Sequence, residues 1–315
     1  MKPLFFMLVK RKIIRQGIGG HTIFLPIKWV RERGLKPGDE IEIDETGPSL
    51  LISTGSAAVK EAKISFSSES ETFIRIKLHD LYRLGYTKIK ISYKTKKQSK
   101  IIHEVCSKYL LGSEVTLDTG SEIILEDLVG LDLDKHHTLM RRIFYIMREC
   151  FEITQDGLSN PDEFLLNQIK IHSQKIDQYD NFCRRSISQK RFTDERTHFY
   201  WTFFVYLRLI QHNMLHFGNF IVKNDFKIIN KKIGESFEIL KNLFLDLEKG
   251  FFKEDIKIIE KVHNSANRLL YEKLLLEFKN VPKEQGALIY YISELARTIY
   301  LSTSPAIGIL AARNN

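Results

Sequence analysis

Basic side chains dominate the start of the chain. Residues 1–38 contain nine lysines and arginines and one acid, Glu32. The cations are Lys2, Lys10, Arg11, Lys12, Arg15, Lys28, Arg31, Arg33 and Lys36. Such a cluster can neutralise phosphate groups and release their counterions, which gives an affinity for nucleic acids that falls with salt. A charge run is more often a solvated surface. This run alternates with strand-forming residues and flanks a turn, which strengthens the nucleic-acid interpretation.

Two other patterns contain residues that could do chemistry. His212 and His216 are four residues apart, so they share one face of a helix and could bind a metal ion. A histidine pair on an amphipathic helix is more often part of the surface or the core. Asp118-Thr119-Gly120 has the composition of the acid-protease triplet, but it lacks the apolar residues that precede that triplet and falls in a predicted hairpin turn.

The sequence contains none of the common catalytic motifs. It has no Walker loop, no GxSxG elbow and no HExxH, and the glycines at 17, 19 and 20 precede a strand, unlike a dinucleotide fingerprint. We therefore expect that the protein is not an enzyme. Three widely spaced cysteines without a CxxC pair predict buried thiols. The apolar stretch at 4–9 is too short to cross a bilayer, and we expect a cytoplasmic protein.

The elements that position the first cations are short. Residues 9–16 read as a strand, the glycines that follow as a turn, and residues 21–25 as a second strand closed by Pro26. A two-turn helix ends at Gly34, a turn contains Pro37 and Gly38, and strands follow at 40–43 and near 50. Because so few residues cannot bury a stable core alone, we expect this region to pair with a second copy.

Residues 9–53 resemble the swapped-hairpin DNA-binding domains of the AbrB, MazE and SpoVT kind. The resemblance lies in the basic strand, the glycine turn, "IFLPIKWV" and "GLKPGDEIEI". It implies an intertwined dimer whose two hairpins face duplex DNA. Carried over by position, the DNA contacts are Lys10, Arg11, Lys12 and Arg15, with Lys28 and Arg31 in support. His21 is a departure, since the family usually has a small polar residue there.

Residues 56–132 predict a small α/β layer. Residues 71–93 alternate as a strand or as a strand followed by a helix: a short helix at 79–86 is expected to stop at Gly85, and a strand to span 87–93. A helix is expected to span 99–112, and two strands to surround the Asp118-Thr119-Gly120 turn. Four lysines between 94 and 100 (Lys94, Lys96, Lys97 and Lys100) are expected to form a solvated loop rather than a second nucleic-acid contact.

The remainder of the chain predicts six long helices in a bundle. The expected spans are 136–155, 161–188, 194–222, 226–249, 253–279 and 283–302, joined by short loops. Asn160 followed by Pro161, and Thr193 followed by Asp194, are expected to start two of them. Gly157, Gly250 and Pro305 are expected to mark helix ends.

This helical region resembles the PhoU family, whose members have two three-helix repeats and help regulate phosphate uptake. The likeness lies in "IHSQKIDQYDNFCRRSI" and "YLRLIQHNMLHFGNFI". Family members bind metal clusters through Glu-x-x-x-Asp pairs, but at those positions this chain keeps only Asp177. His212 and His216 are then substitute candidates, and we expect neither a metal nor another cofactor.

Together these patterns predict a multidomain protein. The predicted parts are an all-β swapped-hairpin domain at 1–55, a small α/β domain at 56–132 and an all-α bundle of two three-helix repeats at 133–315. A fusion of this kind occurs in archaeal phosphate uptake regulators. We expect a transcriptional regulator that binds duplex DNA as a homodimer through its basic N-terminal strand, with the bundle as a sensor or partner-binding module. The alternative is a protein-interaction adaptor in phosphate transport control whose N-terminal domain only dimerises.

Overall fold

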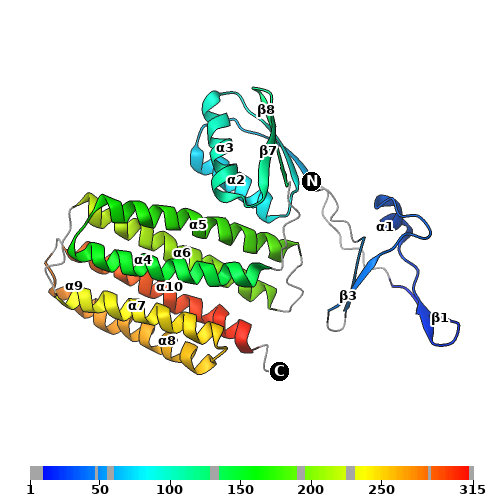
Figure 1. The fold of residues 1–315 in the computed structure, drawn as a ribbon. Helices are drawn as coiled ribbons and strands as arrows, with labels where there is room; N and C mark the ends of the chain where they lie inside the picture. The colour runs from blue at the N-terminus through cyan, green and yellow to red at the C-terminus, as the bar shows by residue number, and fades with distance from the viewer. Residues whose placement is uncertain are drawn as a thin grey trace. The chain divides into compact units, whose positions relative to one another are not determined.

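The computed structural model describes residues 10–46, 49–54, 60–127, 135–189, 196–224, 231–282 and 285–311. The chain divides into two compact units, residues 1–58 and 59–315. The boundaries predicted after residues 55 and 132 fall outside the described residues. The described residues are mostly helical, with small β-sheets (Figure 1). No helix within the described residues combines the length and apolarity needed to cross a bilayer.

Unit 1 consists of two β-hairpins and a short helix. Strands β1 (Ile14–Gln16) and β2 (Gly20–Thr22) pair antiparallel, as do β3 (Glu42–Thr46) and β4 (Ser49–Ser53). Helix α1 (Ile27–Glu32) lies between the hairpins in sequence. Gly17 and Gly19 have φ of 65° and 90°, so glycines make the β1–β2 turn possible. Of the described part of the strand predicted at 9–16, only Ile14–Gln16 forms a strand, which pairs with β2.

The first part of unit 2 is an α/β layer. Its elements are β5 (Glu61–Ser65), α2 (Glu71–Arg83), β6 (Lys88–Ser92), α3 (Lys96–Tyr109), β7 (Ser113–Asp118) and β8 (Glu122–Asp127). The sheet order is β5-β6-β8-β7, with β5 and β6 parallel and the other pairs antiparallel. Alternate residues of the central strands β6 and β8 are buried and form a core with α2 and α3. The predicted Asp118-Thr119-Gly120 turn is confirmed, with Gly120 at φ 87°.

Two predictions for this layer were wrong in detail. Helix α2 begins at Glu71, well before the predicted short helix, because the Ser70 hydroxyl accepts a hydrogen bond from the Phe73 N–H. The lysine-rich stretch is not a loop beyond Thr95. Thr95 and Gln98 form a capping box that starts α3 at Lys96, so three of the four lysines lie on this helix.

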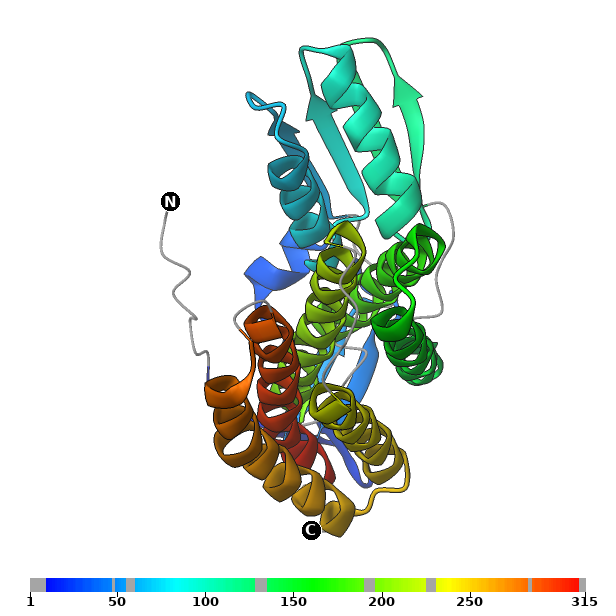
Figure 2. The ribbon, with the colours of Figure 1, turned by 90° about the vertical axis from the view of Figure 1, so that its left-hand side faces the viewer.

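The second part of unit 2 is a helical bundle. Its helices are α4 (His136–Ser159), α5 (Glu163–Ser188), α6 (Thr197–Lys223), α7 (Lys231–Phe252), α8 (Ile256–Arg268), α9 (Leu274–Asn280) and α10 (Gly286–Ala311). A π-helical turn, η2 (Leu269–Lys273), connects α8 to α9. Figures 1 and 2 show the long helices side by side, with α6 and α10 adjacent. A continuous apolar core rich in phenylalanine joins them.

Several predicted helix boundaries were wrong. Asp162 rather than Asn160 caps α5, and the cap predicted at 193–194 falls outside the described residues. Helices α4, α7 and α10 run through Gly157, Gly250 and Pro305 instead of ending there. At Gly250 a Cβ atom would lie 2.7 Å from Ile259 Cδ1, so this glycine permits close packing of α7 on α8 and does not end the helix. The left-handed residue after α7 is Glu254, at φ 57°.

Candidate functional site

The four cations predicted to contact DNA on the first strand lie on or before the β1–β2 hairpin. Arg15 is in β1 and pairs with His21 of β2. Lys10, Arg11 and Lys12 precede the strand, and all four side chains are exposed. The hairpin therefore presents these cations to solvent. His21, the residue that differs from the resembled family's usual small polar residue, lies opposite Arg15 in the hairpin.

The two supporting cations lie on α1. Lys28 and Arg31 are exposed, and Lys28 makes only a long, solvent-exposed ion pair of 3.9 Å with Glu32. Such pairs contribute little, which leaves Lys28 available to another anion. Within the described residues, no hydrogen bond or ion pair connects these two cations to the four on or before the β1–β2 hairpin, which lie in unit 1 (Figure 1).

Unit 1 exposes apolar as well as basic side chains. None of its described residues whose burial is given is fully buried, and α1 has no buried residue. The exposed large apolar residues of this unit are Ile13, Ile14, Ile18, Ile23, Phe24, Ile27, Ile43 and Leu50. An apolar surface of this extent on so small a unit is typical of a protein–protein interface.

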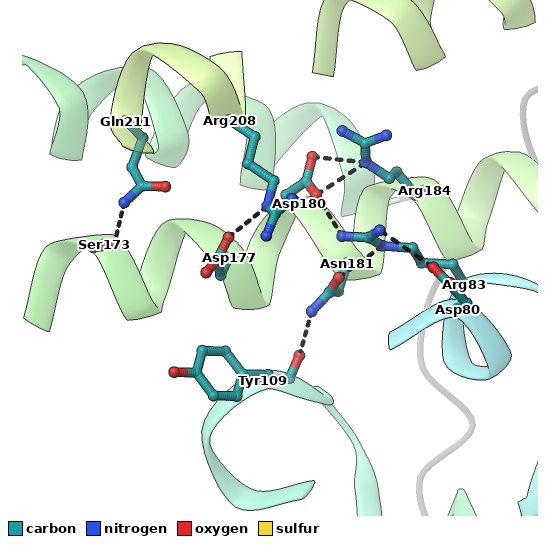
Figure 3. A network of polar contacts seen from close by, with 10 residues as sticks. All are labelled: Asp80, Arg83, Tyr109, Ser173, Asp177, Asp180, Asn181, Arg184, Arg208 and Gln211. Carbon is teal, nitrogen blue, oxygen red and sulfur yellow. Dashed lines mark hydrogen bonds and ion pairs between the residues drawn. The ribbon is translucent and has the colours of Figure 1, made fainter. Parts of the chain in front are cut away.

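Unit 2 contains a buried polar network between α2 of the α/β layer and α5 of the bundle (Figure 3). Asp180 is buried and accepts hydrogen bonds from Arg184 Nε at 2.9 Å and from Arg83 Nη2 at 3.2 Å. Arg83 Nε also donates to Asn181 Oδ1 at 2.8 Å, while Asn181 Nδ2 donates to the Tyr109 carbonyl at 3.1 Å. Burial raises the pKa of Asp180, and Arg184 and Arg83 offset part of that effect.

A second contact of this kind lies near the end of α5. Arg185 is almost fully buried, and its Nη1 donates to the carbonyls of Tyr82 at 2.6 Å and Tyr86 at 3.0 Å. Its Nη2 forms an ion pair with Asp127 of β8. The guanidinium also stacks over the Tyr82 ring, 4.6 Å from its centroid. These bonds attach the α/β layer to the bundle through polar groups rather than through a shared apolar core.

The sequence-based analysis missed this network. The local sequence of α5 gave no signal for it, because only the structure shows that every residue from 176 to 187 is buried. A helix covered on all sides must satisfy its polar side chains internally. The stretch Asp180 to Arg185 contains four polar or charged residues, which a one-sided amphipathic helix would have placed in solvent.

The metal candidates lie at the edge of the same network. The Asp177 carboxylate accepts a hydrogen bond from Arg208 Nε at 2.8 Å, so a guanidinium occupies the position of a cation (Figure 3). The ring centroids of His212 and His216 are 5.2 Å apart on α6. Burial and Arg208 lower the pKa of His212. No group of three or more His, Cys, Asp or Glu residues suited to a metal ion occurs within the residues that the structure describes.

Two other polar pairs connect neighbouring helices of the bundle without carboxylates. Ser173 on α5 accepts a hydrogen bond from the Gln211 side chain on α6. His263 on α8 lies 2.8 Å from the Thr303 hydroxyl on α10. The three cysteines are free and buried, as predicted, and burial raises the pKa of Cys106 to about 12. These groups provide neutral hydrogen bonds between helices rather than a set of anionic ligands.

Comparisons with known protein families, with curated proteins and with solved structures found no match to this chain.

Proposed function

We propose that this protein is a DNA-binding transcriptional regulator that binds duplex DNA as a homodimer through unit 1. One observation carries the proposal. Residues 10–36 contain eight exposed lysines and arginines and a single acid, Glu32, and none of the described residues of this unit whose burial is given is buried. This charge distribution suits phosphate contacts, because each cation can displace a counterion from the duplex.

The exposed apolar residues of unit 1 support the dimer. Each of its β-hairpins has only two strands, and an isolated two-stranded hairpin is marginally stable in water. A second copy of the same unit would cover Phe24, Ile27 and their neighbours and add strand partners. Dimerisation would also place two basic hairpins on one surface, which a single chain does not do.

Unit 2 is the sensor or partner-binding module in this proposal. The resemblance of its helices to the PhoU family suggests phosphate uptake as the regulated process and the cytoplasm as its compartment. The buried polar network between α2 and α5 supports a role for unit 2 as one body, since its bonds connect the α/β layer to the bundle.

A binding experiment with matched variants tests the proposal. Fluorescence anisotropy with the protein's own promoter region and with random duplex would be measured at several salt concentrations. We expect wild-type log K to fall linearly with log salt, with about 0.9 added to the slope for each phosphate contact. Replacing Lys10, Arg11, Lys12 and Arg15 by alanine should abolish binding and leave the dimer intact. Replacing Lys94, Lys96, Lys97 and Lys100 removes the same charge from an exposed part of unit 2 and should change binding little.

The adaptor alternative predicts a different result. If unit 1 serves only for dimerisation, the wild-type protein ignores both duplexes even at low salt, and the quadruple N-terminal variant behaves like the wild type. Equal losses in the two quadruple variants would also contradict the proposal, because they would indicate a general charge effect and not a contact surface.

A further inference from the structure

A cavity of about 260 Å³ lies at one end of the helical bundle. The first turns of α4 and α6 and the last residues of α7 and α10 form it. The lining residues are His137, Met140, Arg141, Tyr200, Phe251, Phe252, Glu254, Ile309 and Leu310. Ligand cavities in helical bundles are typically built in this way, from side chains of several facing helices.

The inner walls of the cavity are apolar and aromatic. Met140, Tyr200, Phe251, Ile309 and Leu310 are all buried in the bundle. Phe252 stands edge-on to the Phe251 ring, with centroids 5.3 Å apart, and belongs to the aromatic contacts of the core. These walls suit the apolar body of a small molecule, and they connect the cavity directly to the packed core.

Arg141 is the distinctive polar group of the cavity. Its guanidinium lies 4.2 Å from the centroid of the Phe252 ring. Within the described part of the chain it forms no hydrogen bond or ion pair. Its neighbour Arg142, by contrast, donates to the Tyr179 hydroxyl at 3.4 Å. Arg141 is thus a cation positioned by an aromatic ring and in the electrostatic field of Glu248, and no described residue accepts a hydrogen bond from its five N–H donors.

We propose that this cavity binds a small aromatic or apolar molecule that carries one anionic group. The apolar body packs against the buried walls, and the anion accepts a forked hydrogen bond from Arg141. Carboxylates and phosphate esters can both accept two parallel hydrogen bonds from a guanidinium, and the calorimetry below compares one ligand of each kind. The site is independent of DNA binding by unit 1.

Calorimetry on the full-length chain tests this site with phenylacetate, phenyl phosphate and the uncharged phenylacetamide as probes. We expect a one-to-one complex with phenylacetate or phenyl phosphate, whichever anion the site prefers, and at least tenfold weaker binding of phenylacetamide. Arg141→Gln should weaken binding of the preferred anion at least tenfold. Arg142→Gln removes the adjacent positive charge outside the cavity and should bind like the wild type. Both arginines are exposed, and circular dichroism would verify that the variants fold.

Two outcomes would overturn the proposal. One is the absence of heat and of a thermal shift with both anions up to about 10 mM, a concentration that detects even millimolar binding. The other is equal affinity of Arg141→Gln and wild type for the anion that binds, which would place the ligand elsewhere. Because neither readout involves DNA, failure here leaves the proposed regulator function unaffected, and the reverse also holds.

Discussion

At the scale of single residues, buried ionic groups decide how the α/β layer is attached to the bundle. Arg185 reaches across from α5 to β8 and to the chain around Gly85, and each of its bonds is made to a group of the other layer. A charge buried in this way is stable only while its partner is present, because the cost of removing it from water is large.

Asp127→Ala should therefore strongly destabilise unit 2. The substitution leaves the Arg185 guanidinium buried without its carboxylate, and we expect the free energy of unfolding to fall by about 3 kcal/mol or more. Urea denaturation followed by circular dichroism would measure the change. Glu126→Ala is the matched control on the same strand, since Glu126 pairs with Lys88 at a solvent-accessible site and its loss should destabilise unit 2 far less. Equal effects of the two substitutions would show that burial of the ion pair is unimportant.

His79 makes the same interface sensitive to acid. It is buried on α2, its Nε2 atom has no hydrogen-bond partner among the described residues, and burial together with Arg83 lowers its pKa from 6.5 to about 3. The folded state thus favours the neutral ring. The free energy of unfolding therefore does not depend on His79 well above pH 6.5. It falls as the pH drops from 6.5 towards 3, because the unfolded state binds a proton at His79 that the folded state does not bind.

We expect His79→Phe to reduce this loss. Between pH 6.5 and pH 5 the wild type should lose about 2 kcal/mol more than the variant, since one unit of pKa difference corresponds to about 1.4 kcal/mol. Urea titrations of both proteins at the two pH values provide the measurement. Parallel pH dependence of the two proteins would mean that His79 is protonated as easily in the folded as in the unfolded state.

At the scale of elements, glycine has two different roles in α7. A Cβ atom on Gly250 would lie 2.7 Å from Ile259 Cδ1 and about 3 Å from two atoms of Ile258, whereas one on Gly234 would meet nothing within 4 Å. Gly250→Ala should lower stability by about 1–2 kcal/mol through overpacking. Gly234→Ala should raise it by about 0.5–1 kcal/mol, because alanine favours helix. Thermal unfolding compares them, and shifts of the same sign would contradict this explanation.

In the connection from α7 to α8, the backbone conformation of one residue predicts how its substitution changes the unfolding temperature. Glu254 has φ 57°, a left-handed conformation that a side chain with a Cβ atom adopts at a cost of about 1–2 kcal/mol. Glu254→Gly should therefore unfold at a higher temperature than Glu254→Ala, because both variants lose the carboxylate and its interactions and only alanine keeps the Cβ atom. Equal unfolding temperatures of the two variants would contradict a backbone cost at this position.

The sequence predicted the existence of most elements better than their ends. Short-range chemistry, such as the hydrogen-bonded turn after Asp118, depends on neighbouring residues and was predictable. Gly250 and Pro305 were misread as helix ends: Gly250 instead permits close packing on Ile258 and Ile259 of the next helix, and α10 continues through Pro305. Asp127 and Arg185 are 58 residues apart, and no local pattern brings them together. The six predicted DNA contacts of unit 1 were identified as cations from the sequence, but no local pattern predicts how they are arranged relative to one another.

At the scale of the whole molecule, the two units differ in how they bury apolar side chains and in how their charge is distributed. Unit 2 has its own extensive apolar cores and internal ion pairs. Unit 1 has exposed apolar side chains, two short hairpins and a concentration of positive charge. A dimer that binds DNA accounts for all three features of unit 1 together, whereas a monomer leaves its apolar surface in water.

The most direct test of this account is the mass of the protein–DNA complex. Light scattering coupled to size-exclusion chromatography at low salt, with a short duplex from the promoter region, gives the number of chains bound. We predict two chains on a minimal duplex, and no complex with the variant in which Lys10, Arg11, Lys12 and Arg15 are alanine. A complex of one chain with one duplex, or an unchanged complex with the quadruple variant, would contradict the claim that paired N-terminal hairpins bind the DNA.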